Sequence, residues 1–152
     1  MEGKTVKETS VWMARFMTPM DVNNAGNVHG GVIMKLIDEA AAIVAIRHAR
    51  SNVVTASVDR LDFVSPVYVG DLVTFKASLN LAGRTSMDVG VRVESENLIT
   101  VEIRHTATAY LTYVALDEDG KPTGVPPLLL ETPEEIRRNR EAQARRALRI
   151  KK

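Results

Sequence analysis

One long segment of the chain has a helical pattern of apolar residues. It runs from about His29 to Arg50, contains VIMKLIDEAAAIVAIRHAR, and has no Gly or Pro after Gly31. This composition predicts a helix. Apolar residues cover nearly the whole circumference, and helices of that kind are buried. We therefore expect this helix to run through the interior of the fold.

The other apolar segments have strand character, because they are rich in β-branched and aromatic residues and often alternate. A short run, VWMARFM, precedes the helix and is ended by Pro19. Four longer runs follow the helix: NVVTASVDRLDFVSP, DLVTFKASLNLAG, TSMDVGVRVESEN and LITVEIRHTATAYLTYVAL. Strands that follow a helix in a row predict an α+β fold with an antiparallel sheet. A curved sheet around the helix would explain why the helix has almost no polar face.

The two ends of the chain differ from this central part. We expect residues 1–10 to form a flexible N-terminus and residues 11–130 to form the folded domain. The segment DEDGKPTGVPP predicts a turn and an extended exit where strand pairing ends. Residues 131–152 predict a basic, solvated helix and tail, with Thr132 as N-cap and Pro133 at the first helical position.

Composition removes several classes of function. The 152 residues fit one domain, the net charge is only +1, and cysteine is absent. Thiol chemistry and thiolate metal sites are therefore excluded, and no overall field favours nucleic acid. No apolar run approaches the ~18 residues that span a bilayer. We expect a cytoplasmic protein without nucleic-acid or membrane partners, although the arginines of the C-terminal helix leave RNA or a membrane surface as an alternative.

A polar loop leads directly into the long helix and carries most of the candidate chemistry. The stretch DVNNAGNVHGG is rich in residues that favour turns, and Asp38 and Glu39 follow two helical turns later. A carboxylate on a buried helix must be paired or reach a cavity. A salt bridge with Lys35 is the structural alternative for at least one of them. The functional alternative is a general base or nucleophile.

The start of the helix supplies a second chemical element. Free backbone N–H groups at a helix N-terminus, next to glycines that admit close approach, can hold a developing oxyanion. Carboxylate, amide side chain and helix start together suit water attack on an activated carbonyl. The three histidines, His29, His48 and His105, lack the spacing of a metal site, so we expect none. These residues alone lead only as far as a possible hydrolase.

The motifs VHGG, LIDE, TASVD and GRTSM, in this order, resemble the acyl-CoA thioesterases of the hotdog superfamily. The closest resemblance is to the cytosolic, or brain-type, acyl-CoA hydrolases and their single-domain bacterial relatives. It implies a hotdog fold, in which a long central helix is wrapped by a curved five-stranded antiparallel sheet, here with an added C-terminal helix. It also implies dimers of hotdogs, their further assembly into trimers of dimers, and active sites between subunits.

The resemblance also implies roles for individual residues. Asp38 is the base or nucleophile, Asn23 comes from the neighbouring subunit, and the backbone N–H groups of Gly30 and Gly31 hold the thioester carbonyl. Second-rank candidates near them are Asn24, Asn27 and His29. Arg84, Thr85 and Ser86 fall where relatives bind coenzyme A, although AGRTS is equally a good turn.

The implied activity is hydrolysis of acyl-CoA to coenzyme A and a carboxylic or fatty acid. No cofactor is expected, since the coenzyme A thioester is the substrate. Two alternatives remain open. One is a hotdog hydratase or dehydratase acting on acyl thioesters, and the other is a non-catalytic module that binds acyl-CoA.

Overall fold

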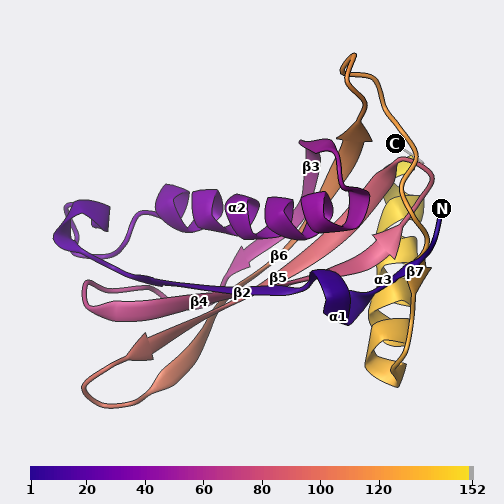
Figure 1. The fold of residues 1–152 in the computed structure, drawn as a ribbon. Helices are drawn as coiled ribbons and strands as arrows, with labels where there is room; N and C mark the ends of the chain where they lie inside the picture. The colour runs from indigo at the N-terminus through magenta and orange to yellow at the C-terminus, as the bar shows by residue number, and fades with distance from the viewer. Residues whose placement is uncertain (151–152) are drawn as a thin grey trace.

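The computed structural model describes residues 1–150. A five-stranded sheet in the order β2-β4-β5-β6-β3 forms the body, and every neighbouring pair is antiparallel. The strands are β2 (Val11–Phe16), β3 (Asn52–Phe63), β4 (Asp71–Ala82), β5 (Ser86–Asn97) and β6 (Ile103–Leu116). The long helix α2 (Gly30–Ala49) lies across one face, which we call the inner face (Figure 1). The α+β architecture expected from the apolar pattern is confirmed.

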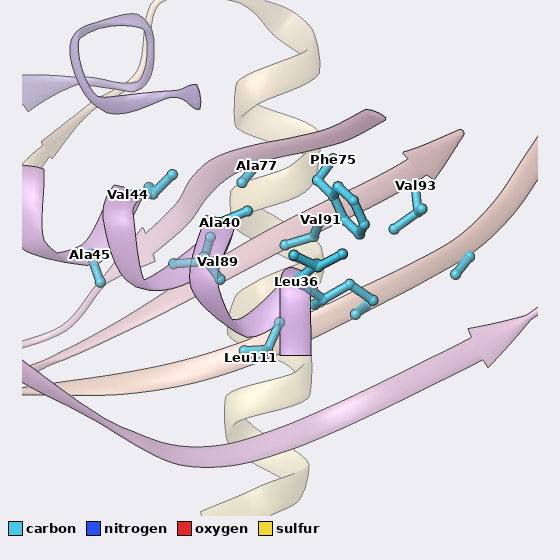
Figure 2. Close-up of a cluster of buried hydrophobic side chains, with 14 of the residues drawn as sticks. Leu36, Ala40, Val44, Ala45, Phe75, Ala77, Val89, Val91, Val93 and Leu111 are labelled. Atoms are coloured by element: carbon cyan, nitrogen blue, oxygen red, sulfur yellow. The ribbon is translucent and has the colours of Figure 1, made fainter. Parts of the chain in front are cut away.

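The hydrophobic core lies between α2 and the inner face. Figure 2 shows Leu36, Ala40 and Val44 of the helix against side chains from the three central strands. Buried and less buried positions alternate along β4, so that Val73, Phe75 and Ala77 all point inward. Small residues on α2 let the helix approach the sheet closely. Burial of this apolar surface is the main stabilising contribution to the fold.

The apolar circumference of α2 led us to expect a helix that is enclosed on all sides. In the structure, one side of α2 is exposed. Met34, Ile43 and Ile46 are 46%, 36% and 45% exposed. The neighbouring edge strand β3 also exposes Val58 and Phe63 on the inner face of the sheet. One chain therefore covers only part of the helix, because no strand of residues 1–150 lies beyond β3. The apolar residues that remain form one exposed strip along α2 and β3.

The opposite, outer face of the sheet carries the C-terminal helix. Helix α3 (Pro133–Ile150) begins as predicted, since Thr132 Oγ1 accepts a hydrogen bond from the Glu135 backbone N–H at 3.1 Å. It is less solvated than expected, because Arg145 and Arg149 pair with carboxylates of the sheet. The two helices therefore lie on different faces (Figure 1).

Both ends of the chain differ from the sequence prediction. The N-terminal segment, for which we expect flexibility, instead contains β1 (Lys4–Thr5) and the short helix α1 (Val6–Thr9), and Val6 is buried. Strand pairing also continues past the turn at 117–127, because β7 (Leu128–Leu129) pairs with β1 in parallel. Lys4 Nζ further donates to the last carbonyl groups of α2. These contacts are long-range and leave no local sequence signal.

Candidate active site

The Asp38 carboxylate faces the sheet and is held by two hydroxyl groups. Thr55 Oγ1 donates to Asp38 Oδ1 at 2.9 Å, and Tyr113 Oη donates to the same oxygen at 2.5 Å. Thr55 and Tyr113 are direct cross-strand partners on β3 and β6. The register of these two strands therefore places both donors opposite one position of α2. Asp38 itself is half-buried.

No cation neutralises this carboxylate. Within residues 1–150, neither Asp38 nor Glu39 lies within 4.0 Å of a lysine, arginine or histidine nitrogen, so the alternative of a salt bridge with Lys35 is wrong. Lys35 and Glu39 point to solvent on the exposed side of α2. Asp38 is thus the one of the two adjacent acids that the fold turns toward other side chains.

Tyr113 is a permanent donor in this cluster. Burial, together with the hydrogen bond to Asp38, raises the pKa of the Tyr113 phenol far above its ordinary value. The phenol therefore keeps its proton at any pH at which the protein works. It can donate to Asp38 but cannot serve as a base.

Asn23 organises its own loop at the other end of α2. Its Oδ1 accepts hydrogen bonds from the backbone N–H groups of Ala25 at 2.9 Å and Asn27 at 3.2 Å. The side-chain amide also lines a cavity of about 410 Å³, with Gly30, Ile33 and Phe63. Asp38 does not line this cavity. Within one chain, the structure therefore does not bring Asn23 and Asp38 together.

Gly30 and Gly31 open helix α2 with their backbone exposed. In the described part of the chain, no acceptor is found for their N–H groups, whereas Val32 N–H donates to the His29 carbonyl at 3.1 Å. A side chain at Gly31 would meet nothing within 4 Å. The helix start is thus open to another molecule. His29 and Asn24 are exposed beside it, and neither side chain contacts Asp38.

The turn between β4 and β5 contains Arg84, Thr85 and Ser86. Gly83 N–H donates to the Ser86 carbonyl at 2.8 Å, which closes the turn. A Cβ atom at Gly83 would lie 3.1 Å from Nη1 of Arg146, so the guanidinium of α3 lies against this turn. A second cation therefore accompanies Arg84 there. Both readings of AGRTS, turn and binding site, remain compatible with this geometry.

The histidines do not form a common site. His48 is fully buried and its Nε2 lies 2.7 Å from the Pro126 carbonyl, whereas His29 is exposed at the start of α2. His105 bonds to Thr108 Oγ1 at 2.6 Å on β6. In residues 1–150, no group of three or more His, Asp or Glu side chains is arranged to hold a metal ion. The same residues include no helix long and apolar enough to cross a membrane.

Sequence reasoning missed the two residues that touch Asp38. Thr55 lies within the TASVD motif that carries the family resemblance, so a motif signal was present. Tyr113 had a weaker signal, namely its place in the alternating pattern of the run LITVEIRHTATAYLTYVAL. The contact of Tyr113 with Asp38 depends on how α2 packs on β6, and no local pattern encodes that packing.

Comparisons with known proteins agree with the fold and the motifs. The family model of the Thioesterase superfamily matches residues 25–102. An uncharacterised acyl-CoA thioester hydrolase of Bacillus subtilis is 42% identical over 135 residues, covering 89% of this chain and 78% of that protein. The human cytosolic acyl coenzyme A thioester hydrolase is 36% identical over 146 residues, and the match spans 95% of this chain but 38% of the human protein.

Solved structures give the same result. A hexameric acyl-CoA thioesterase superimposes with a TM-score of 0.95 at 42% identity, covering 99% of this chain and 97% of that chain. The acyl-CoA hydrolase of Staphylococcus aureus, in complex with butyryl coenzyme A and coenzyme A, gives a TM-score of 0.89 at 37% identity, covering 97% of this chain and 93% of that one.

Proposed function

This chain belongs to the thioesterase superfamily, and on that premise we propose that it hydrolyses acyl-CoA to coenzyme A and a carboxylic acid. One observation carries the proposal. Asp38 is a half-buried carboxylate that is oriented by two hydroxyl groups and forms no ion pair with any residue that the structure describes. Such a group is available to remove a proton or to attack a carbonyl. We propose Asp38 as the reacting acid.

Variants of the Staphylococcus aureus enzyme support this assignment. Structures have been solved of that enzyme with single Asn, Asp and Thr residues each replaced by Ala. In that enzyme, the replaced Asn and Asp are separated by the same number of residues as Asn23 and Asp38 are here. The replaced Asp and Thr are likewise separated by the same number of residues as Asp38 and Thr55. The agreement adds Thr55 to the proposed site.

In the proposed reaction, Asp38 takes a proton from water while the water oxygen bonds to the thioester carbonyl carbon. The backbone N–H groups of Gly30 and Gly31 of the neighbouring subunit hold the oxyanion that forms, because the same groups in the chain that supplies Asp38 lie roughly 12 Å away along α2. The C–S bond then breaks, and the departing thiolate takes the proton back from Asp38. In the alternative route, Asp38 itself bonds to the carbonyl carbon, the thiolate leaves, and water hydrolyses the resulting anhydride. Neither route requires a cofactor.

We propose that two chains complete each site. The exposed strip of α2 and β3 is apolar and ends at an unpaired strand edge, which suits pairing with a second copy. Joining two β3 edges would bring the Asn23 loop of one subunit toward Asp38 of the other. Further assembly of three such dimers into a hexamer is proposed by analogy with the hexameric relatives.

The acyl part and the coenzyme A part of the substrate suit two different places on this dimer. The cavity beside Asn23 also has Ile33, Phe63 and Val64 in its lining, and it suits the acyl chain and thioester. The β4–β5 turn suits coenzyme A, because Thr85 and Ser86 offer hydroxyl groups and Arg84 is free to meet a phosphate. Asn27 lines the same cavity as Asn23 and is proposed to shape it. His29 and Asn24 are proposed only to support the loop.

The proposal is tested by thiol release from short, medium and long acyl-CoAs, followed for the wild-type chain, Asp38→Ala and Asn23→Ala. We expect each variant to lose about a hundredfold or more in rate. The two inactive variants are then unfolded, mixed and refolded together. Mixed dimers contain one site with both residues intact, so activity should return toward about a quarter of the wild-type level if half the dimers are mixed. Near-normal rates in both single variants would disprove the proposed function, and no recovery on mixing would disprove the shared site.

A further inference from the structure

Tyr113 contacts the proposed reacting acid, yet the reaction above gives it no task. We infer that Tyr113 is a positioning residue, whose hydroxyl fixes Asp38 through Oδ1 and thereby makes Oδ2 the oxygen that meets water or substrate. This inference rests on the proposed function, because it concerns the orientation of the acid in that reaction. It goes beyond it by naming which carboxylate oxygen reacts and what holds the other.

The hydrogen bonds at Asp38 are all on one side of the carboxylate. Tyr113 Oη lies 2.5 Å from Oδ1 and 3.0 Å from the Asp38 backbone carbonyl oxygen, and Thr55 Oγ1 lies 2.9 Å from Oδ1. In residues 1–150, no donor is found for Oδ2. Two donors on one oxygen fix the rotation of the carboxylate plane and leave the second oxygen with its lone pairs open. The reacting atom is therefore oriented before any substrate arrives.

Tyr113 is the more rigid of the two donors. Its side chain is only 1% exposed, and its backbone pairs with Thr55 on one side and with Met87 on the other. Thr55 is exposed on the edge strand β3, which has no described partner beyond it. A phenol embedded in the interior sheet thus supplies the fixed point for Asp38. The threonine completes the pair from a strand that the proposed dimer would still have to order.

The chemical nature of the donor also matters. A hydrogen bond from a neutral phenol stabilises the carboxylate anion without adding an opposite charge. An arginine in the same place would hold the carboxylate as an ion pair and make it a poorer base. Because burial keeps the pKa of Tyr113 above its ordinary value, the phenol donates throughout the pH range of the reaction. The other charged groups nearest in the sequence, Lys35 and Glu39, face solvent and make no ion pair with Asp38 within residues 1–150.

The test compares Tyr113→Phe with Tyr110→Phe. Both remove one hydroxyl from β6, but Tyr110 lies on the outer face with Arg145 3.7 Å above its ring. For Tyr113→Phe we expect kcat for acyl-CoA to fall by about tenfold to hundredfold, the range of one hydrogen bond to a charged group, while KM stays within about twofold. Tyr110→Phe should leave kcat and KM unchanged.

Two further measurements separate positioning from simple stabilisation. Rates are expressed per folded protein, with the folded fraction taken from circular dichroism, so that partial unfolding cannot imitate a loss of kcat. Tyr113→Phe is also combined with Asp38→Ala. If Tyr113 acts through Asp38, the double variant should be no slower than Asp38→Ala alone.

The outcomes distinguish the inference from the proposed function. An inactive Asp38→Ala together with a wild-type kcat for Tyr113→Phe would overturn only the inference. A further loss in the double variant would do the same, because the phenol would then act independently of Asp38. Normal hydrolysis by Asp38→Ala would overturn the proposed use of Asp38, and the inference with it.

Discussion

Carboxylates on the two faces of the sheet are held in different ways. On the inner face, Asp38 accepts from the hydroxyls of Thr55 and Tyr113 and forms no ion pair in the described part of the chain. On the outer face, Asp88 is 6% exposed and pairs with Arg145 at 3.0 Å, and Asp59 pairs with Arg149 at 3.0 Å. An acid that is held by neutral donors has no opposite charge beside it and keeps one oxygen open. An acid that pairs with an arginine of α3 holds that helix on the sheet. The chemical nature of the partner, more than the burial of the carboxylate, therefore distinguishes the proposed reacting acid from the structural acids.

The largest effect should come from removing the charge on one face or the other. Asp38→Asn keeps the shape of the side chain but removes the base, so kcat for acyl-CoA should fall by about a hundredfold or more. Its free energy of unfolding should change by less than about 1 kcal/mol, since no ion pair is lost. Asp88→Asn should show the reverse, with nearly normal kcat and clearly reduced stability. Thiol release and urea unfolding, measured on both variants, check the contrast.

Similar losses of kcat in the two variants would break the comparison. So would a large loss of stability in Asp38→Asn alone. Either result would mean that the acids of the two faces serve the same purpose.

The second prediction concerns the clamp of α3 on the outer face. Arg145→Met removes the cation but keeps the aliphatic part of the side chain, and it leaves Asp88 buried without its charge partner. Breaking such a pair typically costs about 3 kcal/mol in free energy of unfolding. The matched control is Arg137→Met, because among residues 1–150 Arg137 pairs only with exposed Glu134 and Glu141 on its own helix. That change should cost about 0.5 kcal/mol.

Urea unfolding of the two arginine variants measures both values. Equal costs would show that Arg145 contributes no more than a surface pair, and that α3 is held by its apolar contacts instead.

Most of the fold could be predicted from the sequence because its signals are local. The uninterrupted apolar segment predicted α2, and the alternating, β-branched run DLVTFKASLNLAG predicted the strand β4. Strand β6 begins at Ile103, five residues later than the apolar run suggested, because the hairpin between β5 and β6 takes up that part. The pairing of β1 with β7 joins the two ends of the chain. Such a contact follows from the packed fold and has no signature in either short segment.

The candidate site could be predicted only for residues that lie within the family motifs. Asp38, Asn23 and the two glycines were predicted through the family motifs, and the structure shows that Gly30 and Gly31 lie at the start of α2. Tyr113 was missed because its contact with Asp38 joins residues far apart in the chain. The arginine pairs of α3 were missed for the same reason, since the helix sequence alone suggested a solvated surface. Helix packing decided each of these contacts.

A third prediction concerns His48, the other buried polar side chain at α2. Its Nε2 must donate to the Pro126 carbonyl, because a carbonyl only accepts, and its Nδ1 is buried without a partner in residues 1–150. Burial lowers the pKa of His48 below its ordinary value of about 6.5. The unfolded chain therefore binds a proton first, and stability is lost as the pH falls below about 6.5. His48→Gln retains a donor that does not titrate.

Urea unfolding at pH values of about 7 and about 5.5 measures this effect. The wild-type chain should lose about 1 kcal/mol more than His48→Gln over this range. Parallel losses in the two proteins would show that His48 is protonated as easily in the folded chain as in the unfolded one. His48 would then no longer stand beside Asp38 as a group on α2 that is held by uncharged partners.

The smallest effect should come from a change at Arg146. This arginine of α3 pairs with no carboxylate in residues 1–150, so it tests whether the outer face also has an arginine that binds substrate. Its guanidinium lies against Gly83, and no Asp or Glu oxygen within residues 1–150 lies within 4.0 Å of it. Arg145 and Arg149, in contrast, are both paired with the sheet. If the β4–β5 turn binds coenzyme A, Arg146 is free to meet one of its phosphates. Arg146→Gln should then raise KM for acyl-CoA by about threefold to tenfold and leave kcat unchanged.

A substrate without the nucleotide decides what the Arg146 change means. An acyl-pantetheine has the same thioester but lacks the nucleotide phosphates, so Arg146→Gln should not change its KM. Added salt should also shrink the difference between wild type and variant for acyl-CoA, because screening weakens a contact between exposed charges. Arg140→Gln is the matched control, since Arg140 is exposed on the same helix and its loss should change neither substrate's KM. An equal rise in KM for acyl-pantetheine would show that Arg146 supports the turn mechanically, and the outer face would then have only structural arginines.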